Sequence, residues 1–395
     1  MSRIVVAGGA GAMGRITVRD LARTADRGIE IVVADRNVSE ARRVTRGLGP
    51  RVRAVAADVT RPASLGAAVA GATVIVNACH HSLNLLVMDA ALRAGSHYCD
   101  LGGLFHMTRR QLARDAEFRR AGLLAICGIG SAPGIVNVMA RAAADRLDRV
   151  DDIHVAVGTR DETPRRGVSL LAASYSLQTV LDEASLPAAL FTGGRLTFVE
   201  PLSGAGPVRF PRPVGLLHPA RTLHSELATL PHSFESKRIR EVSFRIAFPD
   251  GLADRLRFVN ALGLTSTHPI TVNGRTIVPR EALLALLARA PRPVVTGPRD
   301  EYEILRVVVR GRIGRRRIEE VVDCHVPGVI DRHAGVDIDT GAPPSIVAQM
   351  LVSGEIRGAG VLPPERVVPA RPFFAELRQR GMRIVRRRRA HARGH

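Results

Sequence analysis

The sequence predicts an α/β protein: a doubly wound parallel sheet, followed by a second, α+β domain with a mixed, largely antiparallel sheet. Three observations support this fold class. Through about residue 135, short β-branched runs alternate with amphipathic segments rich in Ala and Arg. A glycine-rich turn directly follows the first of these runs. From about residue 150, stretches of alternating apolar and polar residues indicate antiparallel strands.

The first part contains five strand patterns with helical patterns between them. We predict strands at residues 3–7, 30–34, 52–56, 73–78 and 123–126. We predict helices at residues 13–24, 39–48, 62–69, 84–94 and 108–121. Strands that alternate with helices in this way form a parallel sheet covered on both faces.

The second part has longer strand patterns and irregular loops. We predict strands at residues 152–158, 240–248, 302–309 and 319–325, and a loop-rich stretch at 193–213. Two later helices are predicted at 345–353 and 373–380, and both should return to the first domain. We therefore predict one domain of residues 1–134 and 340–395, and a second domain of residues 135–339.

Composition favours a soluble, cytoplasmic chain. The 46% apolar and 24% charged residues are ordinary for globular proteins, and no apolar stretch approaches the roughly 20 residues of a membrane helix. The four cysteines are scattered, without disulfide-framework or zinc-ligand spacing. We expect no membrane partner, no disulfide and no metal.

The net charge of +20 raises the question of a nucleic-acid partner. Lys237 is the only lysine, six arginines lie between Arg383 and Arg393, and no groove-reading motif accompanies the charge. We therefore expect no nucleic acid, and we expect the basic tail to be a solvated, frayed end.

The glycine-rich turn has the spacing of a dinucleotide-binding motif. Gly9, Gly11 and Gly14 follow the first strand and open a helix, with Ala12 and Met13 inside the motif. The three glycines permit a tight turn, close approach of the pyrophosphate and close packing of the helix on the strand. The pyrophosphate then binds the free N–H groups of the helix N-terminus. The sequence thus predicts a Rossmann domain.

Asp35 lies at the end of the second strand, twenty-one residues after Gly14. An acidic residue there binds the adenosine ribose hydroxyls and repels a 2′-phosphate, which favours NAD. Arg36 follows directly and could stack on adenine or reach a 2′-phosphate, so NADP stays as the alternative.

Further polar residues lie at the carboxyl edge of the predicted sheet. Asp58 and Val59 end the third strand, and Asn77 and Ala78 end the fourth. We expect Asp58 beside the adenine and Asn77 near the nicotinamide ribose. An equally good interpretation of Asp58 is a cap of the following helix.

Four further segments carry a resemblance to a known family. They are Tyr98-Cys99-Asp100-Leu101-Gly102-Gly103, Ala132-Pro133-Gly134, the stretch 215–231 and Gly360-Val361-Leu362-Pro363-Pro364-Glu365. With them the chain resembles the saccharopine dehydrogenase-like family over nearly its whole length, and is most similar to L-lysine 6-dehydrogenases. We expect Gly102 and Pro133 at the cofactor site.

The resemblance implies NAD-dependent oxidation of a lysine-like amine to an imine, which hydrolyses to a semialdehyde. It also implies a homodimer or larger closed assembly, with the second domain serving substrate binding and oligomerisation. Related saccharopine reductases and carboxynorspermidine dehydrogenases instead join an amine to an aldehyde and reduce the imine. All share hydride transfer between nicotinamide and a carbon bearing nitrogen.

Histidine and tyrosine residues are the candidates for acid–base chemistry. His218 lies in the 215–231 stretch and is the candidate base, with a surface loop histidine as the alternative. Tyr175 could donate a hydrogen bond to substrate or pack in the core. His80 and His81 follow the fourth strand and should border the nicotinamide.

Two charged residues are candidates for binding an amino-acid substrate. Arg221 could bind its carboxylate, although most arginines in so basic a chain are solvated. Asp100 could bind its ammonium group or orient the Gly102 turn. The chain departs from the lysine dehydrogenase pattern after His218, so the substrate could differ from lysine, and a non-catalytic dinucleotide-binding regulator is the competing interpretation.

Overall fold

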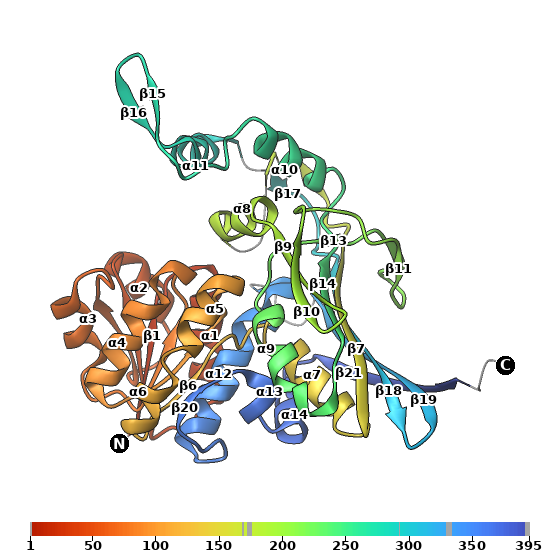
Figure 1. Cartoon of the computed structure of the whole chain (residues 1–395). Helices are drawn as coiled ribbons and strands as arrows, with labels where there is room; N and C mark the ends of the chain where they lie inside the picture. Colours follow the sequence, from red (N-terminus) through yellow and green to blue (C-terminus); the bar gives the residue numbers. More distant parts are fainter. Residues whose placement is uncertain (1, 168–169, 172–175, 292, 329–333, 392–395) are drawn as a thin grey trace.

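The computed structural model describes residues 2–167, 170–171, 176–291, 293–328 and 334–391. It contains two large sheets (Figure 1). Residues 383–391, which the predicted boundaries assign to the first domain, form a strand of the second sheet. No helix among the described residues combines the length and the apolar character needed to cross a bilayer.

The first sheet has seven parallel strands in the order β20-β6-β5-β4-β1-β2-β3. Its strands are β1 (Arg3–Ala7), β2 (Glu30–Asp35), β3 (Val52–Ala56), β4 (Val74–Asn77), β5 (His97–Asp100), β6 (Leu124–Ile126) and β20 (Gly360–Leu362). The order reverses between β1 and β4, which is the switch point of a doubly wound sheet. This confirms the predicted fold class.

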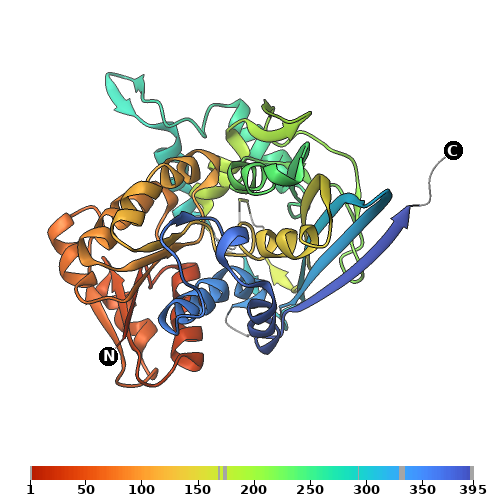
Figure 2. The same cartoon turned by 60° about the horizontal axis from the view of Figure 1, so that its bottom comes forward.

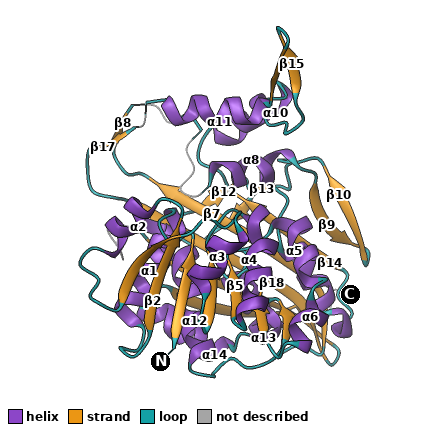
Figure 3. Ribbon diagram, turned by 90° about the vertical axis from the view of Figure 1, so that its left-hand side faces the viewer, coloured by secondary structure: helices purple, strands orange, loops and turns teal. Residues whose placement is uncertain are grey.

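Helices cover both faces of this sheet (Figure 3). They are α1 (Ala12–Thr24), α2 (Val38–Thr45), α3 (Pro62–Val69), α4 (Asn84–Ala94), α5 (Leu104–Leu112) and α6 (Asp115–Arg120), with the short η1 (His81–Leu83) before α4. The sequence does not predict β5 as a strand, because its last three residues are buried in succession, without an apolar–polar alternation. The single helix predicted at 108–121 is two helices, α5 and α6.

The second sheet has the order β10-β9-β14-β7-β18-β19-β21, and β13 also pairs with β14. Neighbouring strands are antiparallel except β14 and β7, so the sheet is mixed and largely antiparallel as predicted. Its strands are β7 (Arg149–Asp161), β9 (Ala188–Thr192), β10 (Arg195–Val199), β13 (Ala220–Arg221), β14 (Glu241–Ile246), β18 (Glu301–Ile313), β19 (Arg316–Pro327) and β21 (Arg383–His391).

Helices and short strand pairs surround the second sheet, and one hairpin projects from the body (Figure 1). The helices are α7 (Ile135–Ala144), α8 (Leu177–Ser185), α9 (Glu226–Ser233), η2 (Glu235–Lys237), α10 (Leu252–Ala261) and α11 (Pro279–Arg289). The short strands are β8 (Arg165–Arg166), β11 (Val208–Arg209), β12 (Leu216–Leu217), β15 (Ile270–Val272), β16 (Arg275–Ile277) and β17 (Val294–Val295).

The segment after β19 divides between the two sheets. It contains η3 (Gly335–Asp337), α12 (Ile338–Val352), α13 (Pro364–Val367) and α14 (Ala370–Gln379). α12 packs on α1 and on strands of the first sheet, and it begins before the Pro343-Pro344 pair, ahead of the predicted start.

Residues 383–391 form a strand, β21, where the composition suggests a frayed tail. Residues 392–395 of that predicted tail lie outside the described residues. β21 pairs along β19 at the edge of the second sheet (Figure 2). Arg386 and Arg388 both bind the carboxylate of Glu320, which is 1% exposed in its side chain. The arginines that suggested a solvated tail therefore neutralise buried carboxylates.

A buried ion pair ties α14 and α12 to the first domain. Arg380 donates to both oxygens of Asp20 in α1 at 2.9 Å, and Ser345 of α12 donates to the same carboxylate at 2.7 Å. The side chains of Arg380 and Asp20 are 1% and 2% exposed.

Replacing Arg380 with Ala should strongly destabilise the chain, because it leaves the buried Asp20 carboxylate with the exposed Arg23 as its one remaining ion-pair partner among the described residues. We expect a loss of about 3–5 kcal/mol in the free energy of unfolding, measured by urea denaturation. Arg23 pairs with the same carboxylate from a solvent-exposed position, so Arg23→Ala should cost less than about 1 kcal/mol. Equal losses in the two variants would contradict this interpretation.

Candidate active site

A cavity of about 400 Å³ lies between the carboxyl edge of the first sheet and the second domain. The first domain supplies the start of α1 and the loops after β4, β5 and β6, while the second supplies α8, β14 and the segment before α9. This is the position in which open α/β sheets bind ligands.

The α1 end of the cavity fits the pyrophosphate of a dinucleotide. Gly11 is the N-cap of α1 without a side-chain cap, and Gly11, Ala12 and Met13 line the cavity. A Cβ atom at Gly14 would overlap the carbonyl oxygen of Gly8, and one at Gly9 would meet the side chain of Val33. The glycines are thus required for the turn, which leaves backbone N–H groups open to an anion.

Asp35 lies at the end of β2, where its carboxylate can meet the adenosine ribose. It accepts hydrogen bonds from the N–H groups of Ala10, at 3.1 Å, and Asn37, at 2.9 Å. Arg36 is exposed. The negative charge is therefore held close to the glycine-rich turn, while the arginine remains free to move.

Asp58 forms a local turn beside Val59, both half-buried at the end of β3. Its carboxylate accepts from the N–H and hydroxyl of Thr60, and these bonds lower its pKa. The helix cap of α3 is Arg61, so Asp58 is not the N-cap itself.

Asn77 and Asp100 are buried beneath the cavity and do not line it. Asn77 donates to Asn84 and Tyr98, and Asp100 accepts from the N–H of Gly102 at 2.8 Å. Burial raises the pKa of Asp100, and its donors act against that shift. Asp100 thus orients the loop, the second of the two predicted roles, while Ala78, Gly102 and Pro133 themselves line the cavity.

The residues predicted for catalysis and carboxylate binding are not brought together. His218 is exposed and outside the cavity lining, because the β12 and β13 pairings turn its loop outwards. Arg221 is also outside the lining and donates to the carbonyl of Gly204 at 2.6 Å. Tyr175 lies outside the described residues.

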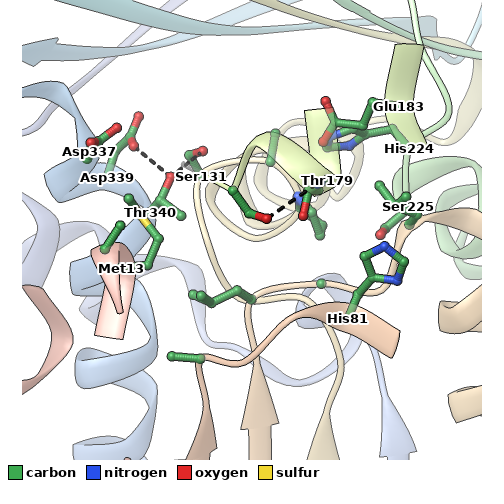
Figure 4. A pocket seen from close by; sticks show the side chains of 18 of the residues that line it. Met13, His81, Ser131, Thr179, Glu183, His224, Ser225, Asp337, Asp339 and Thr340 are labelled. Atoms are coloured by element: carbon green, nitrogen blue, oxygen red, sulfur yellow. Dashed lines mark hydrogen bonds and ion pairs between the residues drawn. The ribbon is translucent and has the colours of Figure 1, made fainter. Parts of the chain in front are cut away.

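His224, six residues after His218, lines the cavity, which His218 does not. Its ring stacks on Phe244 with 3.7 Å between the ring centroids, and its Nδ1 lies 2.5 Å from the Glu226 carboxylate. Its Nε2 lies 3.9 Å from Glu183, another cavity residue (Figure 4). Burial lowers the pKa of His224, but the charge of Glu226, the hydrogen bond that the ring donates to Glu226 and the charge of Glu183 raise it overall.

The hydrogen bond between Thr108 of α5 and Ser225, at 3.2 Å, holds the His224 segment against the first domain. The sequence does contain a signal for this site: His224 and Glu226 are two residues apart, just before a helix. The family resemblance points instead to the 215–218 loop, so sequence reasoning passes over this pair.

His80 and His81 line the cavity, and the fold brings them to Asp182 of α8. That they border the nicotinamide stays a prediction. His81 Nε2 lies 3.0 Å from the Asp182 carboxylate, and Arg280 contacts the other oxygen of the same carboxylate. Burial first, and then His81, lower the pKa of His80 to about 4, so this ring is neutral. The three residues could hold a metal ion by geometry, but Arg280 already supplies a cation, and the absence of a metal stays a prediction.

Cys79, between the dinucleotide edge and these histidines, is a thiol at neutral pH. Burial and the charge of Asp35 raise its pKa to about 12. Its side chain therefore forms part of the cavity wall and does not act as a nucleophile.

Two family profiles together match almost the whole chain. Residues 4–126 match the saccharopine dehydrogenase NADP binding domain, and residues 130–382 match the saccharopine dehydrogenase C-terminal domain. The chain belongs to the saccharopine dehydrogenase family. It is thus an NAD(P)-dependent oxidoreductase by family, and the resemblance to the saccharopine dehydrogenase-like family is confirmed. The closer similarity to L-lysine 6-dehydrogenases stays a prediction.

Two curated relatives in this family align over most of their length. A carboxyaminopropylagmatine dehydrogenase of Synechocystis sp. is 24% identical over 97% of this chain and 96% of the relative. A carboxynorspermidine synthase of Vibrio cholerae is 25% identical over 78% of this chain and 76% of the relative.

Two solved structures share the fold of this family member along the chain. Saccharopine dehydrogenase (L-Glu forming) of Saccharomyces cerevisiae superposes with a TM-score of 0.70 at 15% identity, over 99% of this chain and 100% of that one. Homospermidine synthase of Legionella pneumophila, solved with NAD, superposes with a TM-score of 0.71 at 12% identity, over 98% of this chain and 91% of that one.

Replacing Asp35 with Ser should shift the cofactor preference of this family member towards NADPH. The carboxylate repels a 2′-phosphate, so its removal should raise the ratio of NADPH to NADH affinity at least ~10-fold. Fluorescence titration of both reduced cofactors measures this ratio. Glu40→Gln, which removes one negative charge from α2, should leave the affinity ratio unchanged. If Glu40→Gln shifted the ratio as much as Asp35→Ser, the shift would reflect net charge and not a specific contact of Asp35 with the ribose.

Proposed function

We propose that this chain joins a cationic amine to an aldehyde and reduces the resulting imine, so that a new C–N single bond remains. The composition of the cavity wall carries the proposal. Among the described lining residues there are four carboxylates and three histidines, and neither Arg nor Lys. They are Glu183, Glu303, Asp337, Asp339, His80, His81 and His224.

A wall of this charge favours an ammonium or guanidinium group and disfavours an anion. The names of the relatives agree with such a substrate, since agmatine and norspermidine are cationic amines. Oxidative deamination of a lysine-like amine, which the sequence resemblance implies, remains a prediction that the same assay tests.

His224 is the proposed general acid, and it takes the role that the resemblance assigns to His218. The amine adds to the aldehyde carbon and gives a carbinolamine, whose hydroxyl must leave as water. The imidazolium of His224 donates the proton, water departs, and the C=N bond forms. Glu226, at 2.5 Å from Nδ1, holds the ring and keeps it protonated.

A reduced nicotinamide bound at the edge of the first sheet supplies the hydride to the imine carbon. The residues of the chain hold the reactants for that step. The α1 turn fixes the dinucleotide, the Asp100 network fixes the loops beside it, and the acidic wall orients the amine. The product is a secondary amine, which takes up a proton from solvent.

The proposal predicts that oxidation of NADH or NADPH requires an amine and an aldehyde together. We would follow nicotinamide absorbance with putrescine, agmatine, lysine and n-butylamine, each alone and with a semialdehyde. Turnover only with the pair is the expected result. Reduction of NAD by lysine alone would favour oxidative deamination. Cofactor binding without turnover of any amine–aldehyde pair would favour a non-catalytic dinucleotide-binding regulator.

Replacing Glu226 with Gln should move the pH dependence of that reaction. The Glu226 charge raises the pKa of His224 and so keeps the acid form present to higher pH. Without it, the descending limb of kcat/KM should shift to lower pH by about 1–3 units. Glu235→Gln, an exposed carboxylate in η2, should leave the limb in place. An unmoved limb in Glu226→Gln would exclude His224 as the titrating acid.

A further inference from the structure

The side of the cavity opposite His224 contains two carboxyl groups of the acidic wall that have no individual role in this mechanism. Asp339 lies in α12 and is 2% exposed, and Glu303 lies half-buried on β18. Thr159 donates to Glu303 at 2.6 Å, and Thr340 donates to Oδ1 of Asp339 at 3.1 Å. Figure 4 shows Asp339 and His224 on opposite sides of the cavity.

The second oxygen of Asp339 is buried without a donor. Oδ2 accepts no hydrogen bond from an N–H or hydroxyl group of the described residues. Asp339 shares a hydrogen bond with the Glu303 carboxyl, which requires a proton on one of the two groups. Its surroundings are acidic: after burial, Glu303 and then Asp337 raise the pKa of Asp339 well above its usual range, and the hydrogen bond from Thr340 acts against them. A buried carboxyl in this position requires either a proton or a cationic partner.

The arrangement suits an organic cation better than a metal ion. Among the described residues, His80, His81 and Asp182 form a group of three possible metal ligands whose ligand atoms lie within 4.8 Å of one another. Asp339 and Glu303 belong to no such group. An ammonium or guanidinium group carries several N–H donors, which can satisfy separate carboxylate oxygens.

We propose that Asp339 and Glu303 bind the distal cationic nitrogen of the amine substrate while its reacting nitrogen lies near His224. This inference rests on the proposed function and adds the substrate class: an amine with a second positive group at its far end. The site would select diamines and guanidinoalkylamines over simple alkylamines, and Asp339 would be a specificity-determining residue.

The test compares two substrates in two forms of the enzyme. Asp339→Asn resembles the protonated side chain, so it should fold, which thermal unfolding checks. With one aldehyde in common, kcat/KM for putrescine and for agmatine should fall about 10- to 100-fold, because a charge-assisted hydrogen bond is lost. The value for n-butylamine, which has no distal cation, should not change. Glu303→Gln should show the same selectivity.

Glu355→Gln, an exposed carboxylate just beyond α12, is the control and should change neither value. A fall of equal size for putrescine and n-butylamine, or no fall for either, would overturn the inference.

If no amine is turned over at all, the proposed function fails, and calorimetry of putrescine with the NAD-bound chain decides the inference by itself. If the unsubstituted chain binds putrescine and Asp339→Asn does not, the subsite is supported. If both bind putrescine equally, or the unsubstituted chain does not bind it, the inference is overturned.

Discussion

The buried carboxylate of Asp100 holds together the loops that form the floor of the cavity. Its Oδ1 accepts hydrogen bonds from the N–H groups of Gly102 and Gly128, each at 2.8 Å, and Oδ2 accepts from Tyr98 at 2.8 Å. A buried charge is tolerated only when such donors satisfy it. Because Gly102 and Gly128 follow different strands, one side chain sets the relative position of both loops, and through them the shape of the site.

The first domain can be predicted in detail because its constraints are local in the sequence. Periodicity places five of its strands, and the spacing of the glycines places the dinucleotide turn. The sequence does not predict β5, because a strand of four residues with three buried in succession shows no periodic pattern. The prediction of a frayed tail at β21 is wrong for a different reason: composition cannot reveal that Glu320 lies buried alongside its arginines.

The acid–base side of the site depends on contacts between distant parts of the chain. His224 and Glu183 are 41 positions apart, and His81 and Asp182 are 101 apart, so spacing cannot pair them. His218 is the natural candidate from the resemblance, but the pairing of β12 and β13 turns it outwards. Asp339 carries no motif at all, and only its burial and the missing donor single it out.

The position of β21 has a consequence for how the protein is made. Glu320 and Asp323, with side chains 1% and 0% exposed, are synthesised more than sixty residues before the arginines of the last strand that bind them. Asp323 already has Arg306 on the neighbouring strand, whereas Glu320 has only β21 for its ion pairs among the described residues. The edge of the second sheet is therefore completed only after β21 has been synthesised, and until then Glu320 lacks the arginines that bind it.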